Sequence, residues 1–391
     1  MSLLPIEQKM WQEKAAPKTK NGKSTIDIVA KYHSRENRIL TKISREKLPS
    51  FAQALMKPGY MDLGPFYQRI SRWNKQKQSR LIESFLINIP VPPIILYEES
   101  YSTPEVIDGH QRITAIRDFY ENKLKLTGLE FWSELNGLTY QEIDSTIKRG
   151  IDRRSISIIT VVTESKTHPE EAMFLKQLAF ERINTEGVDL SKQEVRNCLY
   201  DGKMNKLLLE LSRHPIFAEA WGIPTEEVPE LEKNHLYKKM KDAELVLRFF
   251  ALRNLDYFRN GMEGFLDLYM IKSQQFSDED IELLRGIFIE TIELAHQLYE
   301  EKLFKPFDPK SNTWKLSSDK PYYDALMVGL SRHLANAELL VSQKYRVIEE
   351  TKNLFQEDKL GILTGAGKNS KADIQKRIEL LENILLQVIG E

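Results

Sequence analysis

Hydrophobic and polar residues follow two different patterns in this chain, and the change comes at about residue 165. Between residues 25 and 165, short β-branched runs at 94–97 and 156–162 predict strands, and amphipathic segments among them predict short helices. After residue 165, and almost without interruption from residue 203, apolar residues recur at the helical period. The pattern therefore predicts an α+β region that is followed by a mostly α-helical C-terminal region.

The helical pattern is clearest in residues 283–303, 322–333 and 372–389. In the last of these segments, five apolar residues recur every three or four positions. These residues are Ile374, Ile378, Leu381, Leu385 and Val388. A stripe of this kind is typical of a helix that packs one face against a core.

Single residues indicate where several elements end and begin. Three prolines between residues 90 and 93 bar a helix, so the amphipathic segment 75–86 must end before the strand that starts at 94. Ser191 and Glu194 have the spacing of a capping box, and Ser370 stands where it could cap the last helical segment. Helices are therefore expected to begin next to Ser191 and next to Ser370.

These patterns divide the chain into four parts. Residues 1–24 are polar and lysine-rich, and they are expected to form an arm because they can bury little apolar surface. An α+β core at 25–165, a helical extension at 166–255 and a helical C-terminal domain at 256–391 are expected to follow.

Composition narrows the class of protein. The chain has 56 basic and 57 acidic residues, so nucleic acid would have to be bound by local patches and not by an overall positive field. Cys198 is the only cysteine, which excludes an internal disulfide and a zinc site of several thiolates. The sequence shows no signal-peptide core and no long apolar run, so we expect a cytoplasmic protein that makes no contact with a membrane.

Residues 108–112, Asp-Gly-His-Gln-Arg, stand at the point where a short apolar strand gives way to a helical segment at 111–120. The first-turn amides of a helix have no intrahelical partners, and the helix dipole is positive there. This turn is therefore a candidate anion site. Gly109 would let the backbone approach the anion, while His110, Gln111 and Arg112 would offer side-chain donors.

A structural reading of the same turn stays open. In that reading Asp108 caps the helix, Gly109 makes the bend and Arg112 forms a nearby salt bridge. A second stretch at 67–73, Tyr-Gln-Arg-Ile-Ser-Arg-Trp, also carries two arginines. It is either part of the same site or a solvated face on which Trp73 packs inward.

Four motifs, taken in order, resemble the N-terminal domain of GmrSD-type modification-dependent restriction systems. They are Tyr67-Gln68-Arg69 with Trp73, residues 81–85 leading to 89–93, residues 108–115, and residues 184–191 with Glu194. The resemblance covers about residues 25–255. It implies a fold related to ParB and sulfiredoxin, in which a Gly-x-x-Arg turn at a helix N-terminus binds nucleotide phosphates.

The resemblance also implies roles for individual residues. Gly109, Gln111 and Arg112 would line the phosphates of a nucleoside triphosphate, and Asp108 would organise the turn or a metal such as Mg²⁺. Gln68 and Arg69 would approach from a neighbouring element, and a loop with Asn184 would lie nearby.

His110 departs from the family pattern, which usually has Gln at this position. A histidine can still donate to phosphate, and its charge varies near neutral pH, so it is also a candidate general base. Together with Asp108 and Arg112 it forms the candidate catalytic set. The seven histidines of the chain begin no recognisable HNH motif, so nuclease activity of that type is not expected from this chain alone.

Three functional hypotheses remain. The first is a component of a prokaryotic anti-phage or modification-dependent restriction system that binds, and could hydrolyse, a nucleoside triphosphate and acts on DNA directly or through a partner nuclease. The second is a non-catalytic DNA-binding or adaptor protein that grips a nucleic-acid phosphate with the same turn. The third is a ParB-like core that cuts DNA with a metal held by Asp108 and a neighbouring carboxylate.

Overall fold

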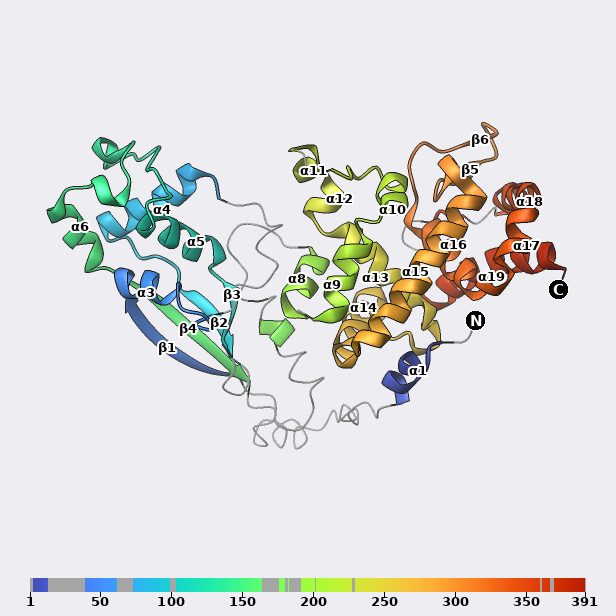
Figure 1. The fold of residues 1–391 in the computed structure, drawn as a ribbon, viewed down its shortest axis with the longest axis horizontal. Helices are drawn as coiled ribbons and strands as arrows, with labels where there is room; N and C mark the ends of the chain where they lie inside the picture. Colours follow the sequence, from blue (N-terminus) through green and yellow to red (C-terminus); the bar gives the residue numbers. More distant parts are fainter. Residues whose placement is uncertain are drawn as a thin grey trace, which may run out of the picture. The chain divides into compact units, whose positions relative to one another are not determined.

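The computed structural model of the chain describes residues 3–12, 39–61, 73–98, 103–163, 176–179, 182, 191–200, 202–226, 229–358, 361–365 and 369–390 (Figure 1). The chain forms two compact units. The sheet unit is Ala16–Asp189, and the helical unit combines Met1–Ala15 with Leu190–Glu391. The helical unit is therefore assembled from segments on both sides of the sheet unit in the sequence.

The described residues of the sheet unit contain one four-stranded sheet in the order β1-β4-β2-β3. The strands are β1 (Ile39–Lys47), β2 (Ile94–Glu98), β3 (Glu105–Asp108) and β4 (Ser155–Thr163). β4 pairs antiparallel with β1 and parallel with β2, and β2 pairs antiparallel with β3. The predicted strands at 94–97 and 156–162 are confirmed as β2 and β4.

Helices cover one face of this sheet (Figure 1). They are α3 (Leu48–Ala54), α4 (Lys75–Ile87), α5 (His110–Tyr120) and α6 (Ser145–Asp152), with the short 3-10 turns η2 (Ser133–Leu135) and η3 (Tyr140–Glu142) before α6. Ile94 and Leu96 of β2 share their buried core with Ile156 and Ile158 of β4 and with apolar residues of these helices. Alternate strand residues point to opposite faces, so these branched side chains supply one continuous apolar layer.

The opposite face is open along β1. Ile43, Arg45 and Lys47 of β1 are exposed, and 73% of the surface of Ile43 is accessible. They pair with Ile159, Ser157 and Ser155 of β4, whose side chains are only partly buried. The same face is buried at β2, where Ile95 and Tyr97 are 9% and 1% exposed, so the open part is confined to β1 and its neighbours on β4.

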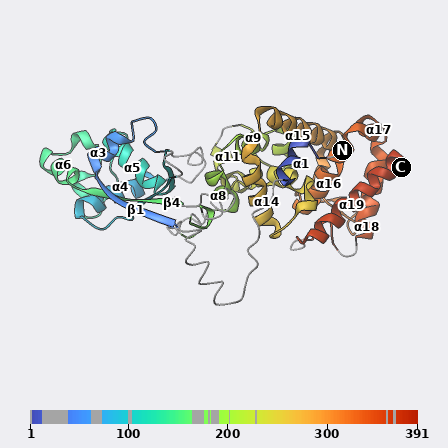
Figure 2. The same cartoon turned by 90° about the horizontal axis from the view of Figure 1, so that it is seen from below.

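The helical unit contains helices of very different lengths, from 4 residues in α12 to 22 in α15. Its helices are α1 (Pro5–Gln12), α8 (Lys192–Leu199), α9 (Lys203–Leu211), α10 (Pro215–Ala220), α11 (Pro229–Lys233), α12 (His235–Lys238), α13 (Lys241–Arg253), α14 (Gly261–Lys272), α15 (Asp278–Tyr299), α16 (Lys320–Arg332), α17 (Ala337–Ser342), α18 (Lys344–Glu357) and α19 (Lys371–Ile389). The 3-10 turns η4 (Leu255–Tyr257), η5 (Ser273–Gln275), η6 (Glu300–Lys302) and η7 (Leu334–Asn336) and the strands β5 (Phe307–Asp308) and β6 (Thr313–Trp314) connect them. α16 and α19 lie side by side in both views (Figures 1 and 2).

A buried ionic cluster joins three of these helices. Nε of Arg248 in α13 donates to Oδ1 of Asp324 in α16 at 3.0 Å, and a second guanidinium nitrogen bonds to the other carboxylate oxygen. Nη1 of Arg377 in α19 lies 3.9 Å from Oδ2 of Asp324. Burial opposes the charge of Arg248, but the Asp324 carboxylate outweighs burial and raises the pKa of Arg248 above its usual value. One carboxylate therefore compensates cations from two neighbouring helices.

Most of the predicted helical elements are confirmed. The segments at 283–303, 322–333 and 372–389 correspond to α15, α16 and α19. The five residues of the predicted stripe on α19 are all buried. Ser191 and Ser370 both form capping boxes, with Glu194 and Asp373 respectively. Within the described ranges, no helix is both long enough and apolar enough to cross a bilayer.

Two expectations about domain organisation differ from the structure. Residues 5–12, expected in a polar arm, form α1, which belongs to the helical unit. Glu7 and Met10 are buried there, and the ring of Trp11 stacks on Tyr257 at 4.8 Å between ring centroids. The polar composition of residues 1–24 hid this short apolar face. The expected boundary at residue 255 also falls inside the helical unit, which is continuous from residue 190.

Replacing Asp324 with Asn should lower the free energy of unfolding by about 3–5 kcal/mol, because the buried Arg248 would lose the carboxylate charge that pairs with it. Urea unfolding followed by circular dichroism measures this loss. Asp278→Asn is the matched control, since the Asp278 side chain is 83% exposed, and its cost should stay within about 0.5 kcal/mol. Equal losses for the two variants would contradict a structural role for the cluster.

Candidate functional site

The turn at residues 108–112 joins β3 to α5, as the sequence pattern predicts. β3 ends at Asp108, and Gly109 is the N-cap residue of α5 with a φ of 108°. The first hydrogen bond of the helix runs from Ile113 N–H to the Gly109 carbonyl at 2.9 Å. The amides that precede Ile113 in the helix lie in the first turn, where no intrahelical acceptor can reach them.

Gly109 is required at this position for two independent reasons. Its positive φ is strained for residues that carry a Cβ. A Cβ atom would also lie 3.0 Å from Cγ1 and 3.2 Å from Cα of Ile94, at the start of β2. The turn therefore passes directly against the neighbouring strand, and only glycine fits.

Asp108 and Arg112 bind to each other. Oδ2 of Asp108 accepts from Nη2 of Arg112 at 2.7 Å, and Oδ1 accepts from the Gly109 N–H at 2.7 Å. Nη2 of Arg112 also donates to the Pro93 carbonyl at 3.0 Å, and only 4% of the arginine surface is exposed. The guanidinium thus ties the turn to the residues before β2.

This geometry changes the role expected for Arg112. A guanidinium that is buried against Asp108 and Pro93 can position the turn, and its contact with a phosphate, which the family resemblance implied, stays a prediction. The structural reading of the motif is right about the salt bridge. It is wrong about the cap, because the Asp108 side chain bonds to the N-cap amide and not to an amide inside the helix.

Gln111 connects the turn with the stretch at residues 67–73. Its Oε1 accepts from the Trp73 backbone N–H at 2.9 Å. Trp73 is half-buried against the core of the sheet unit, as expected for a tryptophan that packs inward. Gln68 and Arg69 lie outside the described residues, and so does the loop with Asn184. The structure thus brings the last residue of the first motif to the start of α5.

His110 is buried, with 9% of its surface exposed. Nothing in the sequence indicates this burial, since the residue stands among polar neighbours at the start of a helix. Its proposed use as a general base would require a substrate that reaches an enclosed imidazole.

The described residues do not fit a metal held by Asp108. Both carboxylate oxygens already accept hydrogen bonds, and one of them faces the Arg112 cation. In the part of the chain that the structure describes, no group of three or more histidine, cysteine, aspartate or glutamate side chains is arranged to hold an ion. We therefore assign no metal to Asp108.

Lys176 is a buried cation near β3 that sequence reasoning missed. Its Nζ forms an ion pair with Glu105 of β3 and lies 4.7 Å from the centroid of the Tyr97 ring. Only 3% of the lysine surface is exposed. Helical spacing indicated a helix near residue 176, but nothing local showed that this segment returns to the sheet.

The basic segment at residues 148–154 separates into structural and exposed groups. Nζ of Lys148 donates to the Gln141 carbonyl at 2.7 Å, and Nη2 of Arg154 lies 3.5 Å from the Leu86 carbonyl. Arg149 and Arg153 are exposed. Arg153 stands two residues before Ser155, which pairs with Lys47 on the open face of the sheet.

Comparison with known proteins supports the resemblance. Residues 53–200 match the family described as the GmrSD restriction endonuclease, N-terminal domain. This range is narrower than the residues 25–255 suggested by the motifs, and it includes the capping box of α8. No curated protein and no solved structure matches the chain.

Gly109→Ala should destabilise the protein by about 2–4 kcal/mol, since it adds a steric contact with Ile94 to the strain of a positive φ. Gly137→Ala is the control, because Gly137 has a φ of 91° and an added Cβ there would meet no atom within 4 Å. That variant carries the backbone strain alone, about 1–2 kcal/mol. Thermal and urea unfolding compare the two, and a smaller cost at Gly109 than at Gly137 would show that the turn does not press on β2.

Proposed function

We propose that this chain, whose residues 53–200 form a GmrSD-type N-terminal domain, is a component of a modification-dependent restriction system that binds a nucleoside triphosphate at the start of α5. The observation that carries the proposal is the Gly109 turn, which the buried Asp108–Arg112 pair holds in place at a helix N-terminus. Such a terminus favours phosphate through its amides and its dipole.

The Asp108–Arg112 pair carries no net charge, so a phosphate would be attracted by the start of the helix itself. Because Asp108 compensates the guanidinium, the main positive potential at this turn comes from the first-turn amides of α5. The hydrogen bond from Trp73 fixes the side-chain oxygen of Gln111, so the amide group of Gln111 is oriented with its donor nitrogen away from Trp73. Gln111 is thus the side chain best placed to donate to a phosphate.

The other expected groups complete the proposal. Gln68, Arg69 and Asn184 remain proposed contacts, and Trp73, the last residue of the first motif, bonds to Gln111 at the start of α5. Mg²⁺ would enter with the triphosphate, because Asp108 is already engaged. The ParB/sulfiredoxin relationship of the fold is also part of the proposal.

Hydrolysis is a separate proposal. The candidate catalytic set is His110 as general base with Asp108 and Arg112 as the pair that holds its turn. Because the sequence carries no HNH motif, we propose two alternatives for the action on DNA. Either a partner nuclease cuts the DNA, or this chain acts on DNA directly through residues outside this turn.

Gln111→Glu should weaken triphosphate binding about tenfold or more, since it puts a negative charge where the phosphates are proposed to lie. The new carboxylate can still accept from the Trp73 amide, so the fold should be unchanged. Calorimetry with each of the four common ribonucleoside triphosphates and Mg²⁺, together with assays of phosphate release with and without DNA, measures the effect.

Gln141→Glu is the matched control, because Gln141 is exposed on η3 in the same unit and should bind as the parent does. If none of the four triphosphates binds the parent protein, or if Gln111→Glu binds them unchanged, the nucleotide site is not at this turn.

The open face of the sheet favours a second candidate function, binding of nucleic-acid phosphate. Arg45 and Lys47 are exposed on one face of β1, and the exposed Arg153 stands next to the partner strand. Positive side chains in this arrangement can follow a phosphate backbone without an overall positive charge on the protein.

Replacing both Arg45 and Lys47 with Gln should make the slope of log affinity for duplex DNA against log salt concentration shallower by about 2. The expected loss is independent of nucleotide. Lys123 and Lys125, which are exposed beyond the end of α5, provide the control double substitution to Gln. Equal slopes for the two doubles, measured by fluorescence anisotropy, would exclude the β1 face.

A further inference from the structure

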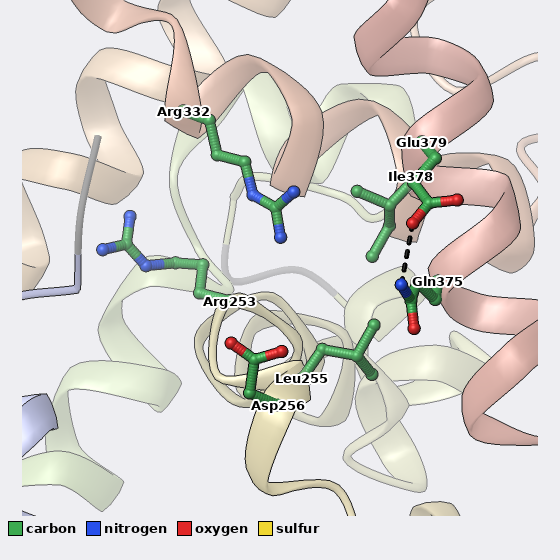
Figure 3. Close-up of a pocket in the computed structure, with 7 residues that line it drawn as sticks. All are labelled: Arg253, Leu255, Asp256, Arg332, Gln375, Ile378 and Glu379. Atoms are coloured by element: carbon green, nitrogen blue, oxygen red, sulfur yellow. Dashed lines mark hydrogen bonds between the residues drawn. The ribbon is translucent and has the colours of Figure 1, made fainter.

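A cavity of about 310 Å³ lies in the helical unit, far along the sequence from the α5 turn (Figure 3). The end of α13 and the following η4, the end of α16, and α19 surround it. No motif in the sequence points to it, because its lining residues come from three separate segments.

The inner part of the cavity combines one arginine with two apolar side chains. Arg253, Leu255 and Ile378 are all buried, with 9%, 6% and 1% of their surfaces exposed. Nη2 of Arg253 lies 3.2 Å from Oε2 of the buried Glu7. Nε of Arg253 is also buried and has no hydrogen-bond partner among the described residues. Figure 3 shows the guanidinium of Arg253 turned away from the centre of the lining residues, so its charge is taken up by the contact with Glu7 and not by the cavity.

A second arginine reaches the cavity from α16. The guanidinium of Arg332 extends from the helix toward the centre of the group of lining residues (Figure 3). Its Nη1 donates to Oε2 of Glu382 at 2.7 Å. The neighbouring His333 and Arg332 hold the pKa of Glu382 below its usual value, so this carboxylate stays ionised and orients the arginine.

The rim of the cavity carries acceptors. Asp256, Gln375 and Glu379 are exposed there. Oε1 of Glu379 accepts from Nε2 of Gln375 at 2.8 Å, and the Asp256 carbonyl accepts from Nζ of Lys371 at 2.8 Å, which fixes the backbone of the residue. Ionised carboxylates are hydrogen-bond acceptors only, and hydroxyl groups are suitable donors for them.

We propose that this cavity binds a small sugar phosphate, with its phosphate against Arg332 and its hydroxyl groups on Asp256 and Glu379. Arginine matches the geometry of phosphate oxygens, and carboxylates commonly accept from the hydroxyls of a ribose. The volume lies near the lower end for small-molecule sites and suits a ligand of this size. Leu255 and Ile378 offer too little apolar surface for a lipid chain, and the Arg332 guanidinium opposes a bare metal cation.

Calorimetry on the full chain with ribose 5-phosphate, inorganic phosphate and ribose tests the proposal. Ribose 5-phosphate should bind with saturation, and ribose without its phosphate should bind at least about tenfold more weakly. Asp256→Asn should weaken binding of ribose 5-phosphate about tenfold, since it replaces one acceptor oxygen and the negative charge with an amide donor. It should not weaken binding of inorganic phosphate, which has no sugar hydroxyl. Asp256 is exposed, so this variant should fold as the parent does.

Arg332→Gln should weaken the binding of ribose 5-phosphate and of inorganic phosphate. If this variant unfolds, Arg332→Lys, which keeps the charge beside Glu382, takes its place in the same measurement. Arg285→Gln on the surface of α15 is the control arginine and should bind as the parent does. The proposal is overturned if ribose 5-phosphate does not bind, or if it binds Asp256→Asn and the Arg332 variants as tightly as the parent. Gln111→Glu should leave this binding unchanged, which separates the cavity from the nucleotide site proposed at α5.

Discussion

Arg112 and Asp108 hold opposite charges in contact at the first turn of α5, and the turn there depends on that contact. The pair connects the end of β3, the start of the helix and the carbonyl of Pro93 before β2. Because Gly109 passes against Ile94, a small displacement of either strand would move the helix start as well. The potential binding surface is therefore set by two residues that do not need to touch a ligand.

The helical unit uses the same physical device for a different purpose. Asp324 lies between Arg248 and Arg377 and joins α13, α16 and α19 through buried charge. Buried ion pairs add little net stability compared with apolar packing, but they strongly penalise arrangements in which one partner is missing. In both units the charged residues thus define which elements lie together, while the apolar residues supply the burial.

Local signals in the sequence predicted the elements better than they predicted the site. The α19 stripe, the capping box at Ser191 and the cap at Ser370 depend on residues a few positions apart, and all were correct. β1 was missed because an exposed strand with lysine and arginine at alternate positions shows no buried face. The turn at 108–112 was located correctly in the chain, but the direction of Arg112 depends on Pro93, which lies 19 residues away and reaches the arginine only in the folded sheet. The buried Lys176 and the cavity around Arg253 depend on still longer separations, which no pattern of neighbours can reveal.

The contact between Glu7 and Arg253 joins residues 246 positions apart, and the whole sheet unit lies between them in the sequence. During synthesis α1 leaves the ribosome long before α13 is made. Glu7 therefore cannot form its contact with Arg253 until the intervening unit has been synthesised. The order of emergence thus lets the inserted unit fold first, and closure of the helical unit around α1 becomes a late step of assembly.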